Sequence, residues 1–267
     1  MLKSNHNKQL AAVLTVAAVL FTGCQTTQTS KADPKKAVKV RTELAAQHIS
    51  RGELDIAKRT LDQALELNSR DATANMLMGV LLQREGSPEN LVKAERYFKQ
   101  SLSIEPKNAQ GRNNYGTYLF QQKRYKDALE QFNIAGSTLG YDQRWLAVEN
   151  AGRVYLELGD IANAEKSFNQ ALNINRDAYN SMIELATLLY LKRDVSGATS
   201  LYERSLRLIG QQNQNARALW VGIRLARANG NPLETQALAN QLRALYPESP
   251  EYQRYLQLQY STEAVWK

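Results

Sequence analysis

Small and bulky residues recur along this chain in one register, with a period close to 34 residues. Five alanines mark the register at spacings of 37, 34, 36 and 34 residues: Ala57, Ala94, Ala128, Ala164 and Ala198. A bulky residue follows each alanine by four positions: Leu61, Phe98, Phe132, Phe168 and Tyr202. A small residue comes three positions later, and positions spaced in this way share one face of an α-helix. The pattern therefore predicts a helix at each of the five places.

An upstream helix is predicted in each of these units as well. Its marker is a small residue twelve positions before the alanine, or fifteen before Ala94: Ala45, Gly79, Gly116, Gly152 and Ala186. Gly or Ala at this place lets two helix backbones approach closely, and the bulky residue fills the space beside the crossing. Each unit is therefore expected to be a pair of packed helices.

These helix pairs resemble the tetratricopeptide repeat, whose motif has the same period of about 34 residues. The residues chosen as the repeat signature are Ala57, Phe98, Gly116, Ala128, Phe132, Gly152, Ala164, Phe168 and Ala198. A weaker sixth unit follows, with Gly222 and Ala239 among its markers. The predicted fold is all-α, a right-handed superhelical solenoid of six tetratricopeptide repeats with a C-terminal capping helix and essentially no sheet.

The repeat boundaries follow from the register. They are expected at 38–71, 72–108, 109–144, 145–178, 179–215 and 216–249, and a capping helix with its tail takes 250–267. Ser87-Pro88 and Ser249-Pro250 each combine a capping side chain with a proline that fits the first helical turn, so each predicts a helix start.

The N-terminal segment is expected to lie outside the repeats. Residues 1–23 contain two lysines and then a twelve-residue apolar run, which is too short to span a bilayer and is typical of a signal peptide. Thr22-Gly23-Cys24 resembles a bacterial lipobox, so Cys24 is predicted to carry lipid, and residues 24–37 are predicted to form a flexible tether. By the same resemblance, Gln25 after the cysteine favours the outer membrane.

Composition argues against several functional classes. The chain has 267 residues and a net charge of +8, but no nucleic-acid recognition motif, so we expect no nucleic-acid partner. Cys24 is the only cysteine, His48 would be the only histidine after removal of the signal, and no phosphate-binding or nucleophile motif is present. We expect no enzyme activity, no metal, no small-molecule substrate and no cofactor beyond the lipid on Cys24.

Several sequence blocks are more specific than a generic repeat. They are 113–119 (N-N-Y-G-T-Y-L), 149–152 (E-N-A-G), 219–224 (L-W-V-G-I-R) and 241–249 (Q-L-R-A-L-Y-P-E-S). These blocks resemble the type IV pilus biogenesis and stability lipoprotein family, the PilF/PilW type. The resemblance implies a tetratricopeptide lipoprotein on the outer membrane that faces the periplasm. It also implies a pilotin role, in which the protein binds the pilus secretin subunit and promotes its outer-membrane localisation and multimerisation, hence pilus biogenesis and twitching motility.

A partner-binding groove is expected on the first helices of the repeats. The candidate residues are Thr42, Ala46, Ile49, Met76, Val80, Gln83, Asn113, Thr117, Phe120, Glu149 and Arg153, with Leu156, Ile183, Thr187 and Tyr190 further along. The apolar character of this set in the first two repeats suggests that they carry an apolar segment of the partner. The alternative is that these residues only pack neighbouring helices, and Asn113 and Asn114 either bind the partner or fix the preceding loop. Another envelope adaptor, for barrel assembly or for peptidoglycan hydrolases, is the competing function.

Overall fold

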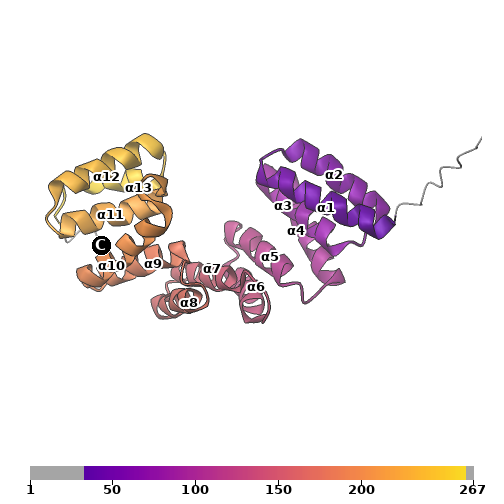
Figure 1. The fold of residues 1–267 in the computed structure, drawn as a ribbon, viewed down its shortest axis with the longest axis horizontal. Coiled ribbons are helices and arrows are strands. Elements are labelled where there is room, and N and C mark those ends of the chain that lie inside the picture. The colour runs from indigo at the N-terminus through magenta and orange to yellow at the C-terminus, as the bar shows by residue number, and fades with distance from the viewer. Residues whose placement is uncertain (1–32, 263–267) are drawn as a thin grey trace, which may run out of the picture. The chain divides into compact units, whose positions relative to one another are not determined.

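A computed structural model describes residues 33–262, and all regular structure in that part of the chain is helical. It contains thirteen α-helices and one 3₁₀ turn, η1 (Gln211–Asn213) (Figure 1). The α-helices are α1 (Pro34–Ser50), α2 (Leu54–Leu67), α3 (Ala72–Glu85), α4 (Pro88–Ile104), α5 (Ala109–Gln121), α6 (Tyr125–Ser137), α7 (Arg144–Glu157), α8 (Ile161–Ile174), α9 (Tyr179–Leu191), α10 (Val195–Ile209), α11 (Ala216–Ala228), α12 (Pro232–Leu245) and α13 (Pro250–Leu258). The all-α prediction is confirmed.

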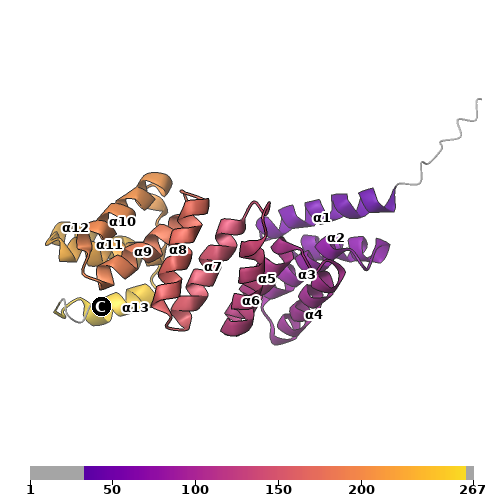
Figure 2. The same ribbon diagram turned by 90° about the horizontal axis from the view of Figure 1, so that it is seen from below.

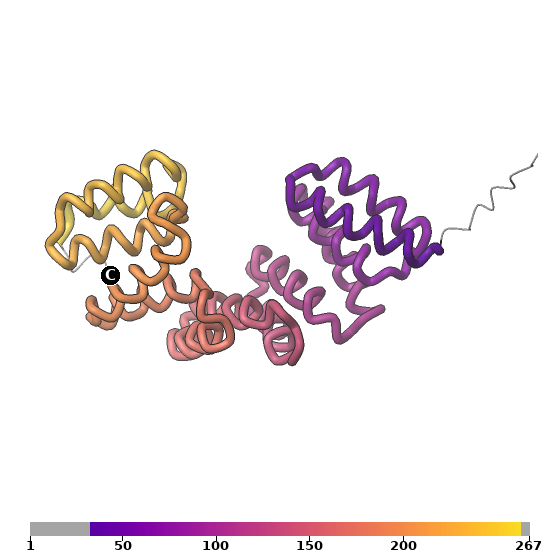
Figure 3. Tube along the Cα trace, viewed as in Figure 1, coloured from indigo at the N-terminus to yellow at the C-terminus, as the bar shows by residue number. Residues whose placement is uncertain are grey.

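The first twelve helices pack as consecutive pairs in chain order, from α1 with α2 to α11 with α12. Figures 2 and 3 show the two helices of each pair lying side by side. First helices also touch the first helix of the next pair, as in α1 with α3, α3 with α5, α5 with α7 and α9 with α11. Every first helix thus has one face toward its own partner and part of another face toward its neighbours.

Glycine at the helix crossing makes room for a phenylalanine of the paired helix. A β-carbon on Gly116 would lie 2.7 Å from the ring of Phe132, and one on Gly152 would lie 2.7 Å from the ring of Phe168. The two rings are 2% and 0% exposed, so each fills a dry pocket between its two helices. The alanines of the repeat register are likewise buried: Ala57, Ala94, Ala128, Ala164 and Ala198.

The helix crossing of the sixth pair is packed by different residues. Its equivalent glycine, Gly222, faces the hydroxyl end of Tyr202, which belongs to the preceding pair. Ala239 stands where the other pairs have a bulky residue, and it is 2% exposed. Tyr202 donates a hydrogen bond to Oε1 of Gln214 at 2.6 Å, so the polar segment before α11 holds the hydroxyl in place.

Turns between paired helices share one backbone arrangement in five of the six pairs. The second residue after the first helix has a positive φ, and it is Gly52, Lys123, Gly159, Arg193 or Gly230. In each turn the next residue donates its N–H to a carbonyl five positions back, as Asp160 does to Tyr155. Left-handed backbone favours glycine, so Lys123 and Arg193 hold a conformation that their β-carbons disfavour.

Helix ends follow the capping signals in the sequence. Ser87 and Ser249 accept the N–H of Asn90 and Tyr252, and the proline after each serine opens the helix, as predicted. The last helix, α13, packs Tyr252, Tyr255 and Leu258 against the cluster around Trp220 and closes the end of the array. Leu256 on the same helix is 40% exposed.

The first helix starts earlier than expected. The prediction of a flexible tether over 24–37 is wrong for its last four residues, because α1 begins at Pro34. Proline suits a first helical position, and Val38, one turn later, is 2% exposed and anchors the helix to the core. The predicted signal peptide, the lipidated Cys24, the rest of the tether and the tail around Trp266 lie outside the described residues. No helix within 33–262 has the length and apolar character needed to cross a membrane.

Candidate functional site

The predicted groove residues divide into two groups in the structure. Five of them are at most 7% exposed: Thr42, Ile49, Met76, Asn113 and Glu149. The others keep exposed surface: Ala46, Val80, Gln83, Thr117, Phe120 and Arg153. The assignment of the buried five to a partner-contacting surface is wrong, because the chosen face of each first helix also packs against the neighbouring first helices. Of the four residues further along, Ile183, Thr187 and Tyr190 are also buried, and only Leu156 is partly exposed.

Glu149 shows what a buried residue of this set does instead. Its carboxylate lies on α7 and is 1% exposed, and its Oε2 accepts the backbone N–H of Ser181 at 3.0 Å and the Ser181 hydroxyl at 2.7 Å. Asn180 donates to its other oxygen at 3.3 Å. The N-cap of α9 is Ala178, which has no capping side chain, so Glu149 of the preceding repeat satisfies the start of α9.

Side-chain amides also link the first helices of successive repeats. Asn150 on α7 donates to Oδ1 of Asn113 on α5 at 3.2 Å, and Gln83 on α3 donates to Gln121 on α5 at 2.7 Å. The role of fixing the preceding loop, which had been considered for Asn113, belongs instead to Asn75 in the second repeat. Its amide donates to the carbonyls of Ser69 and Asp71. These amides therefore align the repeats.

A polar cleft of about 650 Å³ remains on the first-helix side of repeats three to six. It runs from Phe120 and Arg153 to Arg217, and the guanidinium of Arg153 lies 5.2 Å from the centre of the Phe120 ring. Arg217 is paired with both carboxylate oxygens of Glu184, at 3.2 and 2.8 Å. The exposed part of the predicted groove in these repeats is thus polar and charged.

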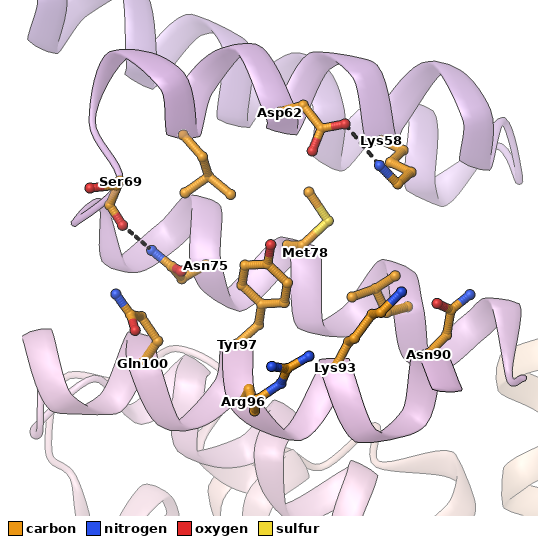
Figure 4. Close-up of a pocket in the computed structure, with 12 residues that line it drawn as sticks. Lys58, Asp62, Ser69, Asn75, Met78, Asn90, Lys93, Arg96, Tyr97 and Gln100 are labelled. Carbon is orange, nitrogen blue, oxygen red and sulfur yellow. Dashed lines mark hydrogen bonds and ion pairs between the residues drawn. The ribbon is translucent and has the colours of Figure 1, made fainter. Parts of the chain in front are cut away.

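A second open site lies between α2 and α4 and has α3 as its floor (Figure 4). We call this cavity of about 640 Å³ the α2–α4 groove. Its apolar lining consists of Leu65, Met78, Leu82 and Tyr97. Figure 4 shows Tyr97 pointing from α4 across the groove toward α2. Leu65 and Tyr97 are partly exposed, so apolar surface is available to a ligand without any change of fold.

Basic side chains border the α2–α4 groove. Lys93 and Arg96 lie on α4, and both are exposed (Figure 4). Lys58 on α2 donates to Asp62 at 2.9 Å, and this hydrogen bond raises the pKa of the lysine. Because Asp62 is already paired with Lys58, the charges of Lys93 and Arg96 give the groove a positive border. Such a site suits a segment that carries both apolar and acidic side chains.

Sequence reasoning missed the α2–α4 groove because it searched only the first helices. A signal was present, since Lys58, Asp62 and Leu65 recur at helical spacing on one second helix. Lys93, Arg96, Tyr97 and Gln100 do so on the next. The residue spacing within each helix does not show that α2 and α4 border the same groove, so the two sets of residues could not be combined from the sequence.

His48 and Asp160 both have structural partners. Nδ1 of His48 lies 2.5 Å from Oε2 of Glu53 across the first inter-helix turn. Asp160 accepts the N–H of Asn163 and caps α8. Within residues 33–262, no three His, Cys, Asp or Glu side chains are grouped so as to hold a metal ion.

Comparisons with known proteins agree with this architecture. Two profiles of the tetratricopeptide repeat match the chain, over residues 89–137 and 147–177. The type IV pilus assembly protein PilF of Pseudomonas aeruginosa PAO1 is 34% identical over 253 residues, which are 92% of this chain and 97% of that protein.

Solved structures lead to the same relatives. A structure of Pseudomonas aeruginosa PilF superposes with a TM-score of 0.73 at 32% identity, covering 84% of this chain and 98% of that one. The crystal structure of PilW, described as a widely conserved type IV pilus biogenesis factor, superposes with a TM-score of 0.69 at 24% identity. The match covers 83% of this chain and 99% of that one. The repeat fold, the sequence identity and its extent over both chains agree, and the protein therefore belongs to the PilF family of tetratricopeptide-repeat proteins of type IV pilus assembly.

Proposed function

We propose that this protein is an outer-membrane lipoprotein of the pilotin type, which binds the secretin subunit of the type IV pilus and promotes its multimerisation in the outer membrane. Membership of the PilF family supports the assignment to pilus assembly. The lipobox-like Thr22-Gly23-Cys24 supports lipid anchoring, and a stack of helix pairs suits protein binding rather than catalysis.

The observation that carries the binding step is the α2–α4 groove. Its apolar lining and positive border fit a secretin segment in which apolar and acidic side chains alternate or cluster. A secretin monomer exposes strands destined for a barrel, and unpaired strand edges aggregate. A segment held in the groove keeps the subunit beside the membrane, where a lipid on Cys24 raises its effective concentration for assembly.

The buried positions of the original groove are poor test sites. Ile49 and Met76 are 4% and 7% exposed, so a charge at either one would disturb the core before it reported on a partner. The exposed Lys93 and Arg96 avoid this problem. The double variant Lys93→Glu/Arg96→Glu reverses the border of the α2–α4 groove, and Arg59→Glu/Lys107→Glu makes the same charge change at exposed sites outside it.

The decisive experiment is complementation of a gene deletion, with the secretin followed by membrane fractionation and unboiled gel electrophoresis. The deletion is expected to abolish outer-membrane secretin multimers. Wild type and Arg59→Glu/Lys107→Glu are expected to restore them, and Lys93→Glu/Arg96→Glu is expected to fail while folding normally by circular dichroism. Normal multimers in the deletion strain would reject the pilotin role and favour the other envelope adaptors. Full rescue by the groove variant would reject the groove.

Lipid anchoring is tested separately. Cys24→Ala is expected to block lipid attachment, release the protein from the membrane fraction and leave binding to the purified secretin subunit intact. Retention of Cys24→Ala in the outer-membrane fraction, together with absence of labelled fatty acid on the wild type, would overturn the anchoring proposal.

A further inference from the structure

One arginine at the C-terminal end of the array is buried without full hydrogen bonding. Arg224 belongs to the L-W-V-G-I-R block on α11, and its side chain lines a cleft of about 560 Å³ between α9 and α13. It is 5% exposed. Its Nε and Nη2 are buried and have no hydrogen-bond partner among residues 33–262.

The rings around Arg224 fix its orientation but leave those two groups unused. Its guanidinium carbon lies 4.2 Å from the centre of the Tyr190 ring and 5.9 Å from that of Trp220. A ring face attracts the cation, whereas the N–H groups lie in the guanidinium plane and need acceptors in that plane. A buried charged donor without an acceptor destabilises the fold, and this cost points to a ligand.

The same two atoms of a neighbouring arginine show which ligand fits. Arg217, about two helical turns earlier on α11, donates from Nε and Nη2 to the two oxygens of Glu184 at 3.2 and 2.8 Å. Nε and Nη2 form one edge of a guanidinium, and a carboxylate matches that edge with two parallel hydrogen bonds. Arg224 presents the same edge with no carboxylate on it.

The surroundings of the cleft favour an anion. Arg217, Arg224 and Arg254 all line it, Glu184 is paired with Arg217, and Glu251 is the acidic residue of the lining. The long side chains of Gln253, Arg254 and Gln257 on α13 line the cleft on one side. These side chains are exposed, so they can move without unfolding α13.

We propose that this cleft binds a carboxylate of a peptide segment, with Arg224 as the two-pronged donor and Arg217 and Arg254 as the surrounding positive charge. The site is distinct from the α2–α4 groove and does not depend on the secretin assignment. The carboxylate is either the C-terminus of a partner chain or an acidic side chain, and small probes distinguish the two.

The first test uses the full-length chain and three compounds. N-acetylalanine mimics a C-terminal carboxylate, the α-amide of N-acetylglutamate mimics a side-chain carboxylate, and N-acetylalanine amide is the neutral control. The indole N–H of Trp220 and the Nε–H of Arg224 are followed by NMR during titration. Saturable shifts with one or both carboxylates and none with the amide support the site, and the compound that binds identifies the source. Absence of shifts with both carboxylates, or equal shifts with the amide, overturns the proposal.

The second test separates binding from a structural role. Arg224→Met removes a buried unpaired charge but keeps an apolar side chain of comparable length, so its thermal midpoint is expected to equal or exceed that of the wild type. The same variant is expected to abolish the Trp220 shift. Arg224→Lys keeps the charge without the two-pronged edge and is expected to weaken binding at least tenfold. Arg243→Met, on the exposed side of α12, is the matched control and is expected to bind normally. A lower midpoint in Arg224→Met with unchanged probe binding would show that Arg224 is only structural.

Discussion

The ring of Phe168 lies beside Gly152 so closely that a β-carbon on the glycine would be 2.7 Å from it. Alanine is the better helix former by about 1 kcal/mol, yet we expect Gly152→Ala to destabilise the protein by about 1–3 kcal/mol, because overpacking outweighs propensity. Urea unfolding measures the change. Phe168→Leu removes the contact, so Gly152→Ala should cost much less in that background. Additive effects in the double variant would contradict the packing explanation.

Two inter-helix turns should gain stability from glycine. Lys123 and Arg193 have φ values of 58° and 70°, where the equivalent turns have Gly52, Gly159 and Gly230. Since left-handed backbone strains a residue with a β-carbon, Lys123→Gly and Arg193→Gly should each raise the free energy of unfolding by about 0.5–1 kcal/mol. The reverse change, Gly159→Lys, should lower it by a similar amount. Thermal or urea unfolding tests all three, and a loss of stability in the glycine variants would contradict the strain argument.

Removal of the Glu149 carboxylate should be among the more damaging single changes. It leaves the N–H and hydroxyl of Ser181 without an acceptor in a buried place, and Ser181 itself is 0% exposed. We expect Glu149→Ala to cost about 2–4 kcal/mol in the free energy of unfolding. Asp160→Ala, which removes the side-chain cap of α8, should cost clearly less than Glu149→Ala. Equal effects of the two variants would show that burial does not matter here.

Acid should weaken the contact between the second and third repeats through Glu95, which lies on α4 and binds Arg124 and Tyr115 of the next repeat. Burial alone would raise the pKa of this carboxyl, but hydrogen bonds from Arg124, Lys99 and Tyr115 hold it at about 2. A depressed pKa stabilises the fold above the ordinary value of 4.5, and this stabilisation is lost as the pH falls from there toward about 2.

Glu95→Gln should therefore cost about 1 kcal/mol near neutral pH and flatten the fall of stability below pH 4.5. Urea midpoints measured across the acid range test this expectation. Glu66→Gln, at an exposed position on α2, is the control and should leave the acid profile unchanged. An acid profile in Glu95→Gln identical to that of the wild type would exclude Glu95 as its source.

The register of Ala57, Ala128 and Ala164 was enough to predict the helix pairs because it reflects a local contact that recurs in each repeat. Gly116 and Gly152 could be identified for the same reason, since each faces a phenylalanine sixteen residues later. The start of α1 was missed because Lys35 and Lys36 look like linker residues, whereas packing of Val38 fixes that turn.

The candidate site was harder to predict because it depends on how neighbouring repeats meet. Glu149 and Met76 occupy positions that look exposed on a single helix pair, but both are covered when the next pair is stacked. The α2–α4 groove shows the opposite relation, because Leu65 and Tyr97 are apolar or aromatic residues of second helices that stay partly exposed in the stacked array. Helical periodicity shows on which face of its helix a residue lies, but it does not show how closely that face approaches the next repeat.

The hydrogen bonds that Ser181 donates to Glu149 make the folding of one repeat depend on its neighbour. A carboxylate on α7 accepts the hydrogen bond of a backbone N–H in the first turn of α9. Loss of the fourth repeat would therefore leave this N–H of the fifth repeat without its acceptor. In a linear array of repeats, an interaction of this kind couples the stabilities of adjacent repeats and makes their unfolding more cooperative. Amide hydrogens of α7 and α9 should thus exchange with solvent in a single opening event, with a common free energy, whereas the two ends of the array open separately.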